Sequence, residues 1–448
     1  MDQQDKLSNQ LNDTTLQDQP KDTPTIQQND TPLTTEQTVT PWDVKGATDA
    51  EGKVQAIDYD RLINHFGCQR ITPELIARFE RVTGKKAHHF LRRGIFFSHR
   101  DLDTALTYYE QGKPIYLYTG RGPSSESMHL GHMVPFIFCK YLQDALDAHL
   151  VIQLTDDEKC LFKEGLTLAQ TTAFAYENAK DIIAVGFNPA KTFMFVDSEY
   201  YGYMFDTILA VQKAINFNQA SSVFGFTPSD SIGKIAFPAT EIAPAFAQSF
   251  RHLFGDAKDV ACLIPCAIDQ DNYFRLGRDL CHKFKAPKTS VVHSVFFPAL
   301  QGPGSKMSAS DANSAIYMTD TAEQIKSKIN RYAFSGGRDT LEEHRRLGGN
   351  PDVDVAFQYL RFFLPDDERL DSIRQEYLSG RMLTGDLKKQ CIAVLQKFVA
   401  DFQAARAAIT PAYQKLFMEL PLTARERKMQ AEIDSLKAKI LELEQATQ

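Results

Sequence analysis

PIYLYTGRGPSSESMHLGH, residues 114–132, joins an apolar run to a glycine-bearing turn and then to the start of a helical pattern. The run at 114–120 predicts a buried strand that ends at a glycine, and HLGHMVPFIFCKYLQDAL at 129–146 predicts a helix. The alternation continues, with strands predicted at 150–157, 192–197, 260–269 and 290–300 and helices at 167–185 and 203–215. This pattern implies an α/β fold, a parallel sheet with helices on both faces. Ligands of such sheets bind beyond the carboxyl ends of the strands.

The length and charge of the chain are those of a multidomain protein that is not a generally basic nucleic-acid binder. At 448 residues it is long enough for two or three domains. The net charge of −7 is uneven, because residues 1–40 hold seven acidic and two basic residues. The rest of the chain is therefore near neutral and can still carry a local basic face for a phosphate backbone. Overall charge neither supports nor excludes RNA.

The sequence offers no membrane span, secretion signal or zinc motif. It has no apolar run of about 18 residues, and its N-terminus lacks a basic segment followed by an apolar one. The seven cysteines are scattered, and only Cys262 and Cys266 are close, without the second pair that a zinc site needs. We therefore expect reduced thiols, no metal held by the protein alone, no membrane contact and a cytoplasmic location.

Both ends of the chain differ from its middle. Residues 1–40 are rich in Gln, Asp, Thr and Asn, and they contain too little apolar surface to offset ordering entropy, so we expect a disordered acidic tail. Helical periodicity predicts a helical extension over 41–110 and a helical region beyond about 320. Residues 421–448 form a charged helical pattern whose a/d seam is Met429, Ile433, Leu436, Ile440 and Leu443. That seam packs either on its own protein or on a second copy.

The turn at 119–132 carries the residue types of a phosphate site. Gly120 and Gly122 let backbone N–H groups approach an anion, and the following helix N-terminus adds partial positive charge. His129 and His132 are three residues apart, so both imidazoles lie on one face of the helix start and can donate to phosphate oxygens. On spacing alone, two satisfied polar residues at a helix start are an equally good interpretation.

A second polar loop, KMSAS at 306–310, follows the predicted strand SVVHSVFFPAL and the loop QGPGS. Lys306 on such a loop can swing over a triphosphate, and Ser308 and Ser310 add hydroxyl donors. A solvated Lys–Ser loop is the alternative. Because both polar elements follow predicted strand ends, we expect them to meet at one edge of the sheet.

MHLGH resembles the HIGH motif of class I aminoacyl-tRNA synthetases, and KMSAS resembles their KMSKS loop. HHFLRRGIFFSHRD, YLYTGRGPSSESMHLGH, VIQLTDDEK, IPCAIDQD, FFPALQG and AFSGGRDT resemble, more specifically, the eukaryotic and archaeal tryptophanyl-tRNA synthetases. The resemblance covers about residues 40–420. It implies a Rossmann-like catalytic domain at 111–320, with the 41–110 extension packed near the active site, and a helical anticodon-binding domain at 321–420.

Such a ligase activates L-tryptophan with ATP and Mg²⁺, releases pyrophosphate, and passes the aminoacyl group to the 3′ end of tRNA(Trp). The substrate carboxylate is itself the nucleophile, so catalysis comes from positioning and from stabilising charge on the departing pyrophosphate. The resemblance assigns this catalytic role to His129, His132 and Lys306. It assigns ATP contacts to Thr119, Gly120, Arg121, Gly122, His129, Gly131, His132, Lys306, Met307, Ser308 and Ser310.

The resemblance also implies an amino-acid pocket. Tyr118 and Gln153 match residues that hold the indole N–H, and a phenol or amide oxygen can accept that hydrogen. The other matches are Glu158 and Gln270 toward the ammonium, Lys159 toward the carboxylate, and Cys266 and Phe274 along the wall. Taken singly, each of these is also compatible with an ordinary structural residue. The pocket gains its support from the motifs in which these residues stand.

Two positions depart from the class pattern. Ala309 replaces a second lysine, as it does in the eukaryotic-type tryptophan enzymes. Glu241, in FPATEIAP, stands where the family leads us to expect Gln near the substrate ammonium. A second carboxylate there would bind the ammonium more strongly or titrate with Glu158 as a coupled pair.

Three alternatives stay open at this point: a tyrosyl-tRNA synthetase, a small nucleotidyltransferase with only the H-x-G-H turn, and a catalytically silent homologue that acts as a binding protein. The fold cannot separate tryptophan from tyrosine. The family is homodimeric through its catalytic domain, so a homodimer is expected. Candidates for tRNA phosphate contact are Arg338, Arg345, Arg346, Lys388 and Lys389, although for any one of them a solvated helix face is the favoured interpretation.

Overall fold

The computed structural model describes residues 36–42, 44–52, 54–307, 313–420, 429–437 and 439–440. Its eleven strands are β1 Thr38–Val39, β2 Val44–Lys45, β3 Gln69–Arg70, β4 Phe96–Arg100, β5 Ile115–Arg121, β6 His149–Leu154, β7 Thr192–Val196, β8 Ala261–Ala267, β9 Ser290–Ser294, β10 Pro298–Ala299 and β11 Gly302–Lys306. Among the described residues, no helix combines the length and apolar character needed to cross a membrane.

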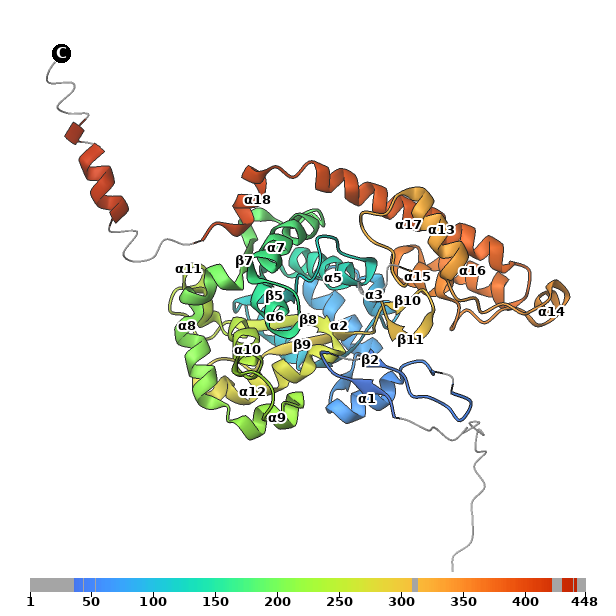
Figure 1. The fold of residues 1–448 in the computed structure, drawn as a ribbon, viewed down its shortest axis with the longest axis horizontal. Helices are drawn as coiled ribbons and strands as arrows, with labels where there is room; N and C mark the ends of the chain where they lie inside the picture. Colours follow the sequence, from blue (N-terminus) through green and yellow to red (C-terminus); the bar gives the residue numbers. More distant parts are fainter. Residues whose placement is uncertain are drawn as a thin grey trace, which may run out of the picture.

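A seven-stranded sheet with the order β3-β4-β9-β8-β5-β6-β7 forms the centre of the molecule (Figure 1). β5 pairs in parallel with β6 and β8, and β7 and β9 continue the parallel pairing on either side. This confirms the α/β fold class. β4 and β3 add an antiparallel edge beyond β9. The carboxyl ends of β5, β6 and β8 therefore meet at one edge of the sheet, where the predicted motifs follow them.

Side chains of β5 alternate between two hydrophobic cores, which explains its unbroken apolar sequence. Tyr116 and Tyr118 belong to one core, with buried residues of α8 (Asp197–Ala214), α10 (Ile232–Ile242) and α12 (Asp271–Phe284). Leu117 belongs to the other core, with residues of α5 (Leu130–Leu146) and α7 (Leu168–Ile183). Both faces of the sheet are thus covered by helices, as the sequence predicts.

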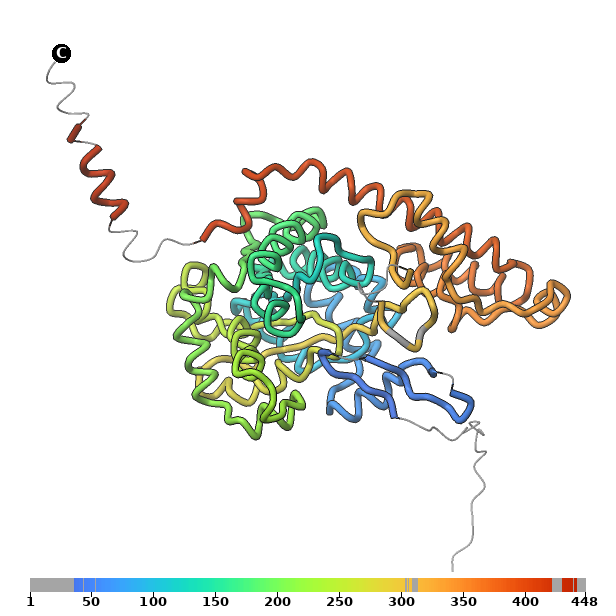
Figure 2. The backbone as a smooth tube through the Cα atoms, in the orientation of Figure 1, coloured from blue at the N-terminus to red at the C-terminus, as the bar shows by residue number. Residues whose placement is uncertain are grey.

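The remaining α-helices lie before, between and after these elements. They are α1 Tyr59–Phe66, α2 Pro73–Thr83, α3 His89–Arg92, α4 Leu102–Glu110, α6 Asp156–Phe162, α9 Phe217–Phe224, α11 Arg251–Phe254, α13 Ala322–Tyr332, α14 Leu341–Leu347, α15 Val355–Phe363, α16 Asp367–Leu378, α17 Thr384–Ala407 and α18 Pro411–Met418. α13 to α17 form a helical region beside the sheet domain, and α18 returns to pack on β7 and α7 (Figures 1 and 2).

Two predicted strands are shorter than expected. The strand predicted at 150–157 ends at Leu154, because Asp156 begins α6 and accepts the backbone N–H of Asp157 with its side chain. The strand predicted at 290–300 ends at Ser294, and the chain then turns into the small antiparallel sheet β1-β2-β11-β10. Apolar residues continue past both true ends, so composition alone does not mark the boundary.

The N-terminal region also contains strands that the sequence pattern does not predict. β4 lies in the segment IFFSHR. Four of its five side chains are buried, so the sequence does not show the alternation of apolar and polar residues that is typical of a half-buried strand. Thr38 and Val39 form β1 and pair with Val44 and Lys45, and Val44 packs into a small hydrophobic core. The disordered tail predicted for residues 1–40 therefore includes two residues that belong to a strand. Both corrections come from long-range pairing, which local composition does not record.

Several predictions fall on residues outside the described ranges. These are the tail over 1–35, Ser308 and Ser310, and the end segments 421–428 and 441–448, including Leu443. Within the C-terminal seam, residues 429–437 are helical, and Met429, Ile433, Leu436 and Ile440 are exposed.

Candidate functional site

A cavity of about 410 Å³ opens at the carboxyl ends of β5, β6 and β8. Most of the residues predicted for ATP and amino acid line it together. They are Thr119, Gly120, Arg121, Gly122, His129, Gly131, His132, Glu158, Lys159, Glu241, Cys266, Gln270, Phe274, Lys306 and Met307. Tyr118 and Gln153 lie directly behind its wall, fully buried. Segments that are almost 180 residues apart in the chain thus form one site.

The H-x-G-H turn places two imidazoles at the start of α5. His129 is the N-cap residue, and its backbone N–H donates to Nδ1 of His132 at 3.3 Å. The two rings stack with centroids 3.4 Å apart. The turn is braced from the far side, since Leu130 N–H donates to the carbonyl of Ile316 and Met318 N–H to that of Met128.

Burial keeps these imidazoles neutral. Desolvation, followed by the positive charge of Arg121, lowers the pKa of His129 to about 3 and that of His132 well below its usual range. Nδ1 of His129 is buried without a hydrogen-bond partner among the described residues. Each neutral ring keeps one N–H donor for a phosphate oxygen.

Arg121 supplies a further donor at the same edge. Its Nε donates to Oδ1 of Asn178 at 3.0 Å, whereas its Nη2 is buried and has no partner in the described part of the chain. Desolvation lowers the pKa of this guanidinium to about 10, which leaves it charged at neutral pH. A buried charge with a free donor is costly unless an anion completes it. The site is therefore suited to a phosphate.

Gly122 packs closely against two charged side chains of the cavity. A Cβ at this position would lie 2.3 Å from Cε of Lys159 and 2.4 Å from Oε2 of Glu158. Any side chain there would displace the two charged groups. The turn thus has glycine where the phosphate end of the cavity meets its amino-acid end.

Lys306 reaches the cavity from the end of β11. Its Nζ donates to Oδ2 of Asp269 at 2.8 Å, and Oδ1 of Asp269 is buried without a hydrogen-bond partner in the described residues. Met307 N–H donates to the carbonyl of Phe297, which fixes the backbone directly after the lysine. The Asp269 carboxylate therefore holds the Lys306 side chain at the cavity.

The N-terminal extension closes this side of the site. β2 pairs with β11 through Lys45 and Ser305, and Ser305 directly precedes Lys306. Pro41 lines the cavity, and the Trp42 ring stacks on Phe162 with centroids 4.4 Å apart. Sequence analysis assigns no role to Trp42, and the pairing of β2 with β11 brings the chain around it to the site.

Acidic side chains gather at the other end of the cavity. Glu158 accepts from Nζ of Lys159 at 2.6 Å and from the Thr155 hydroxyl at 2.9 Å. Glu241 is half-buried beside them, and burial together with the charges of Glu158 and Asp157 raises its pKa to about 8. At neutral pH the Glu241 carboxyl is thus mostly uncharged, which resembles the amide that we expected there.

The cavity wall at this acidic end is aromatic. The Tyr118 hydroxyl donates to Oε1 of Gln153 and to the backbone carbonyl of Glu241 at 2.9 Å. Phe274 meets the Tyr118 ring edge-on, with centroids 5.8 Å apart. Gln270 and Cys266 complete the wall from the end of β8.

The fold brings two residues to the candidate site that the sequence analysis did not name, Asp269 and Asp271. Asp269, the partner of Lys306, stands next to Gln270 in IPCAIDQD, so its place in that motif was an available signal. Asp271, in the same motif, accepts from Nε and Nη2 of Arg100 at 2.7 Å each and from Nε2 of His293 at 2.9 Å. Cys68 lies near Asp271 and His293. Because Arg100 already forms an ion pair with the Asp271 carboxylate, we interpret this group as an anchor between β4 and the start of α12 rather than as a metal site.

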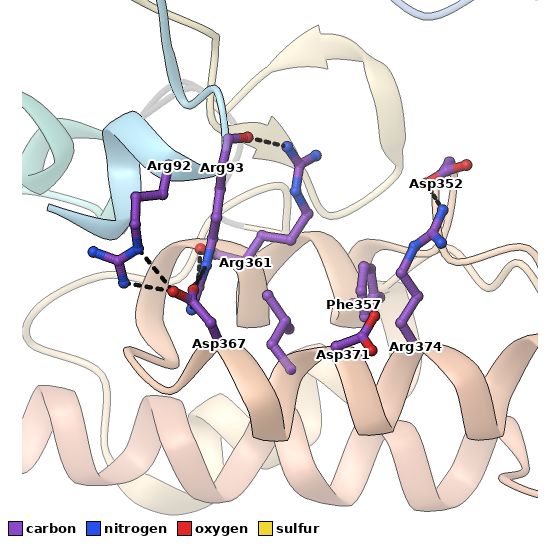
Figure 3. Close-up of a pocket in the computed structure, with 9 residues that line it drawn as sticks. Arg92, Arg93, Asp352, Phe357, Arg361, Asp367, Asp371 and Arg374 are labelled. Atoms are coloured by element: carbon purple, nitrogen blue, oxygen red, sulfur yellow. Dashed lines mark hydrogen bonds and ion pairs between the residues drawn. The ribbon is translucent and has the colours of Figure 1, made fainter. Parts of the chain in front are cut away.

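A larger cavity of about 500 Å³ lies away from the predicted motifs, between α3 and the α15–α16 pair (Figure 3). Its charged groups are largely engaged: Asp367 accepts from Arg92 at 2.8 Å and from Arg93 at 2.7 Å. His89 in the same segment meets the carbonyl of Phe362 at 2.8 Å. The HHFLRRG segment is thereby held against the helical region and does not line the ATP-side cavity.

Most of the residues predicted to contact tRNA form hydrogen bonds or ion pairs within the protein. Arg338 donates to the carbonyl of Gly348, and Arg345 donates to the carbonyls of Gly380 and Arg381. Lys388 donates to the carbonyl of Asn330, and Lys389 pairs with Asp386. Arg346 is exposed.

Known proteins resemble this chain along most of its length. A family model described as class I tRNA synthetases (W and Y) matches residues 110–400. The cytoplasmic tryptophan–tRNA ligase of Schizosaccharomyces pombe is 60% identical over 86% of this chain and 97% of its own length. The cytoplasmic tryptophan–tRNA ligase of Homo sapiens is 57% identical over 85% of this chain and 80% of its own length. The crystal structure of Plasmodium falciparum tryptophanyl-tRNA synthetase is 51% identical, covers 81% of this chain and 95% of its own, and superposes with a TM-score of 0.76.

Proposed function

The chain belongs to the class I tRNA synthetases of the tryptophan and tyrosine branch, and we propose that the 410 Å³ cavity is its site for ATP and tryptophan. The activity is that of a tryptophan–tRNA ligase: it forms tryptophanyl-adenylate with ATP and transfers the aminoacyl group to tRNA. Tryptophan and tRNA are its substrates, and its relatives act in the cytoplasm, where we place it as well. One observation carries the site: the histidine pair, Lys306 and the acidic pocket converge on this cavity.

In the proposed mechanism, the tryptophan carboxylate attacks the α-phosphorus. A bond forms between the carboxylate oxygen and phosphorus, the α–β bridging bond breaks, and pyrophosphate leaves with its electrons. The nucleophile is already ionised, so the site needs no base. His129, His132, Arg121 and Lys306 donate hydrogen bonds to the phosphates as negative charge moves onto pyrophosphate. Thr119, Gly120, Gly122, Gly131 and Met307 shape the nucleotide side.

Mg²⁺ would accompany ATP in this proposal and would neutralise charge on its phosphates. The chain contributes one fitting group, because Oδ1 of Asp269 is a buried hard oxygen with no hydrogen-bond partner in the described residues.

At the amino-acid end, Glu158 and Gln270 face the ammonium and Lys159 meets the carboxylate. Tyr118 and Gln153 accept the indole N–H, and Phe274 and Cys266 pack on the ring. The observation in favour is that the two acceptors are fully buried and already hydrogen-bonded to each other. A site built on such acceptors rejects analogues without the N–H by about 10⁴- to 10⁵-fold.

Glu241→Gln is expected to remove a pH dependence of tryptophan binding. The pKa of Glu241 is raised to about 8, so the wild-type carboxyl is uncharged below that pH and ionised above it. Ionisation strengthens the hydrogen bond to the ammonium by roughly 1 kcal/mol, or about fivefold in affinity. Tryptophan Kd, measured by calorimetry from pH 6 to 9, should tighten with pH in the wild type only. Parallel profiles for the two proteins would contradict a role for Glu241.

We also propose a homodimer that forms through α8. Phe205 and Leu209 lie one turn apart on this helix, and their side chains are 47% and 49% exposed. Phe217, at the start of the following helix α9, is also exposed. An apolar stripe of this kind suits a two-fold interface. Leu209→Glu should convert the protein to a monomer in sedimentation velocity, whereas Leu416→Glu on α18, also exposed, should not. A dimer that persists in Leu209→Glu would place the interface elsewhere.

ATP–pyrophosphate exchange tests the site assignment as a whole. Tryptophan and tyrosine are supplied separately to the purified full chain, with Lys306→Ala as the control. Exchange with tryptophan alone, lost in the variant, is the expected result. Exchange with tyrosine would overturn the pocket assignment, and no exchange with either would favour a silent homologue.

A further inference from the structure

A buried carboxylate stands behind the two residues proposed to accept the indole N–H. Asp197 is the first residue of α8, directly after β7, and it is fully buried. Both of its oxygens accept from Nε2 of Gln153, at 2.8 and 2.9 Å. It does not line the cavity. Asp197 therefore stands one residue behind the cavity wall, which it contacts through Gln153.

This contact decides which end of the Gln153 amide faces the pocket. An amide has a donor end and an acceptor end of nearly the same shape, and its hydrogen-bond partners fix the choice. Carboxylate oxygens only accept, so they hold the NH₂ group, and the carbonyl of Thr240 at 3.4 Å holds it too. Oε1 of Gln153 must then point to Tyr118, whose hydroxyl donates to it.

The orientation passes on to Tyr118. The hydroxyl hydrogen of Tyr118 is used on Oε1 of Gln153 and the carbonyl of Glu241. Only lone pairs of the phenol oxygen are left for a ligand. With the Gln153 amide reversed, its NH₂ would donate to the phenol oxygen and occupy those lone pairs. The fixed order of donors thus keeps an acceptor open in the pocket.

The groups around Asp197 keep this order. Asp157 approaches Asp197 from α6, and Glu241 approaches it from α10. Burial, followed by the charge of Asp157, raises the pKa of Asp197, and burial raises the pKa of Asp157 to about 6. An uncharged Asp197 carboxyl keeps acceptor lone pairs toward Gln153, and the carbonyl of Thr240, which can only accept, holds the same NH₂ group.

We propose that Asp197 is a positioning residue that fixes the Gln153 amide, and through it Tyr118, as hydrogen-bond acceptors for the indole N–H. This inference rests on the proposed role of Tyr118 and Gln153. Asp197 thereby contributes to substrate specificity without touching the substrate.

The test compares tryptophan with 3-benzothienyl-L-alanine, in which sulfur replaces the indole N–H. kcat/KM is measured for each in ATP–pyrophosphate exchange, for the wild type, Asp197→Asn, Tyr118→Phe and the double variant. Asparagine can present its own NH₂ to Gln153 and let the amide reverse. The matched control is Ser198→Ala, which removes the Ser198 hydrogen bond to Asp156 at 2.6 Å from the same helix start.

Asp197→Asn should lower the preference for tryptophan over the analogue by at least tenfold, through the KM for tryptophan, with the KM for ATP and the kcat/KM for the analogue unchanged. Ser198→Ala should leave the preference unchanged, and the double variant should lose no more than Tyr118→Phe alone. An equal fall for both amino acids, or an unchanged preference, would overturn the inference. If Tyr118→Phe also keeps the preference, the proposed role of Tyr118 fails and the inference with it. Should Asp197→Asn not fold, as judged by thermal unfolding, Asp197→Ser supports or overturns the inference on the same ratio.

Discussion

Lys306→Ala is expected to lower the rate of tryptophan activation by about 10²- to 10³-fold and to leave tryptophan affinity nearly unchanged. The ammonium stabilises charge that develops on the departing pyrophosphate, and loss of one such donor costs roughly 2.7–4 kcal/mol of transition-state stabilisation. In the structure, Nζ of Lys306 donates to Asp269 at 2.8 Å, whereas Glu158 of the proposed amino-acid pocket accepts from Lys159. Its removal should therefore change kcat, not the tryptophan pocket.

The measurement is single-turnover adenylate formation, with tryptophan Kd from calorimetry. Lys326→Ala is the matched control, because Lys326 on α13 is exposed and pairs only loosely with Glu323 at 3.6 Å. Equal losses in rate and tryptophan affinity would contradict the assignment of Lys306 to the phosphates. A full rate in Lys306→Ala would remove the lysine from the mechanism.

Asp271→Ala is expected to destabilise the protein by about 3–5 kcal/mol, because it leaves the Arg100 guanidinium buried without its partner. Asp271 is fully buried and accepts from Arg100 and His293, which belong to β4 and β9. Urea unfolding gives the change in the free energy of unfolding. Asp144→Ala breaks the exposed pair of Lys140 and Asp144 on α5 and should cost only about 0.3–0.5 kcal/mol. Similar losses in the two variants would refute the anchoring role.

The lowered pKa of Asp271 predicts that the stability of the protein depends on pH. Burial opposes its charge, but the hydrogen bonds from Arg100 and His293 outweigh burial and hold the pKa of Asp271 far below its usual value. Its contribution to stability is therefore complete above the ordinary pKa of aspartate, near 4, and is lost as the pH falls toward the folded-state pKa. The difference in unfolding free energy between wild type and Asp271→Ala should narrow below pH 4. A constant difference down to pH 2 would contradict the linkage.

The sequence predicted the parts of this protein that are written in consecutive residues. The apolar run before Gly120, the glycines of the turn and the spacing of His129 and His132 follow from local chemistry, and the motifs around them identify the family. The order of strands and helices fixed the α/β class, because each strand needs a helix to return the chain in parallel. Fifteen of the residues predicted for the site line one cavity for this reason.

The contacts between segments that lie far apart in the sequence became known only from the tertiary structure. β4 joins the sheet by antiparallel pairing with β9, and β2 reaches the strand that ends in Lys306. The contacts of Asp197 with Gln153 and of Asp269 with Lys306 join residues 44 and 37 positions apart. No local pattern records such pairs, because a buried acid finds its hydrogen-bond partners wherever the packing of strands places them.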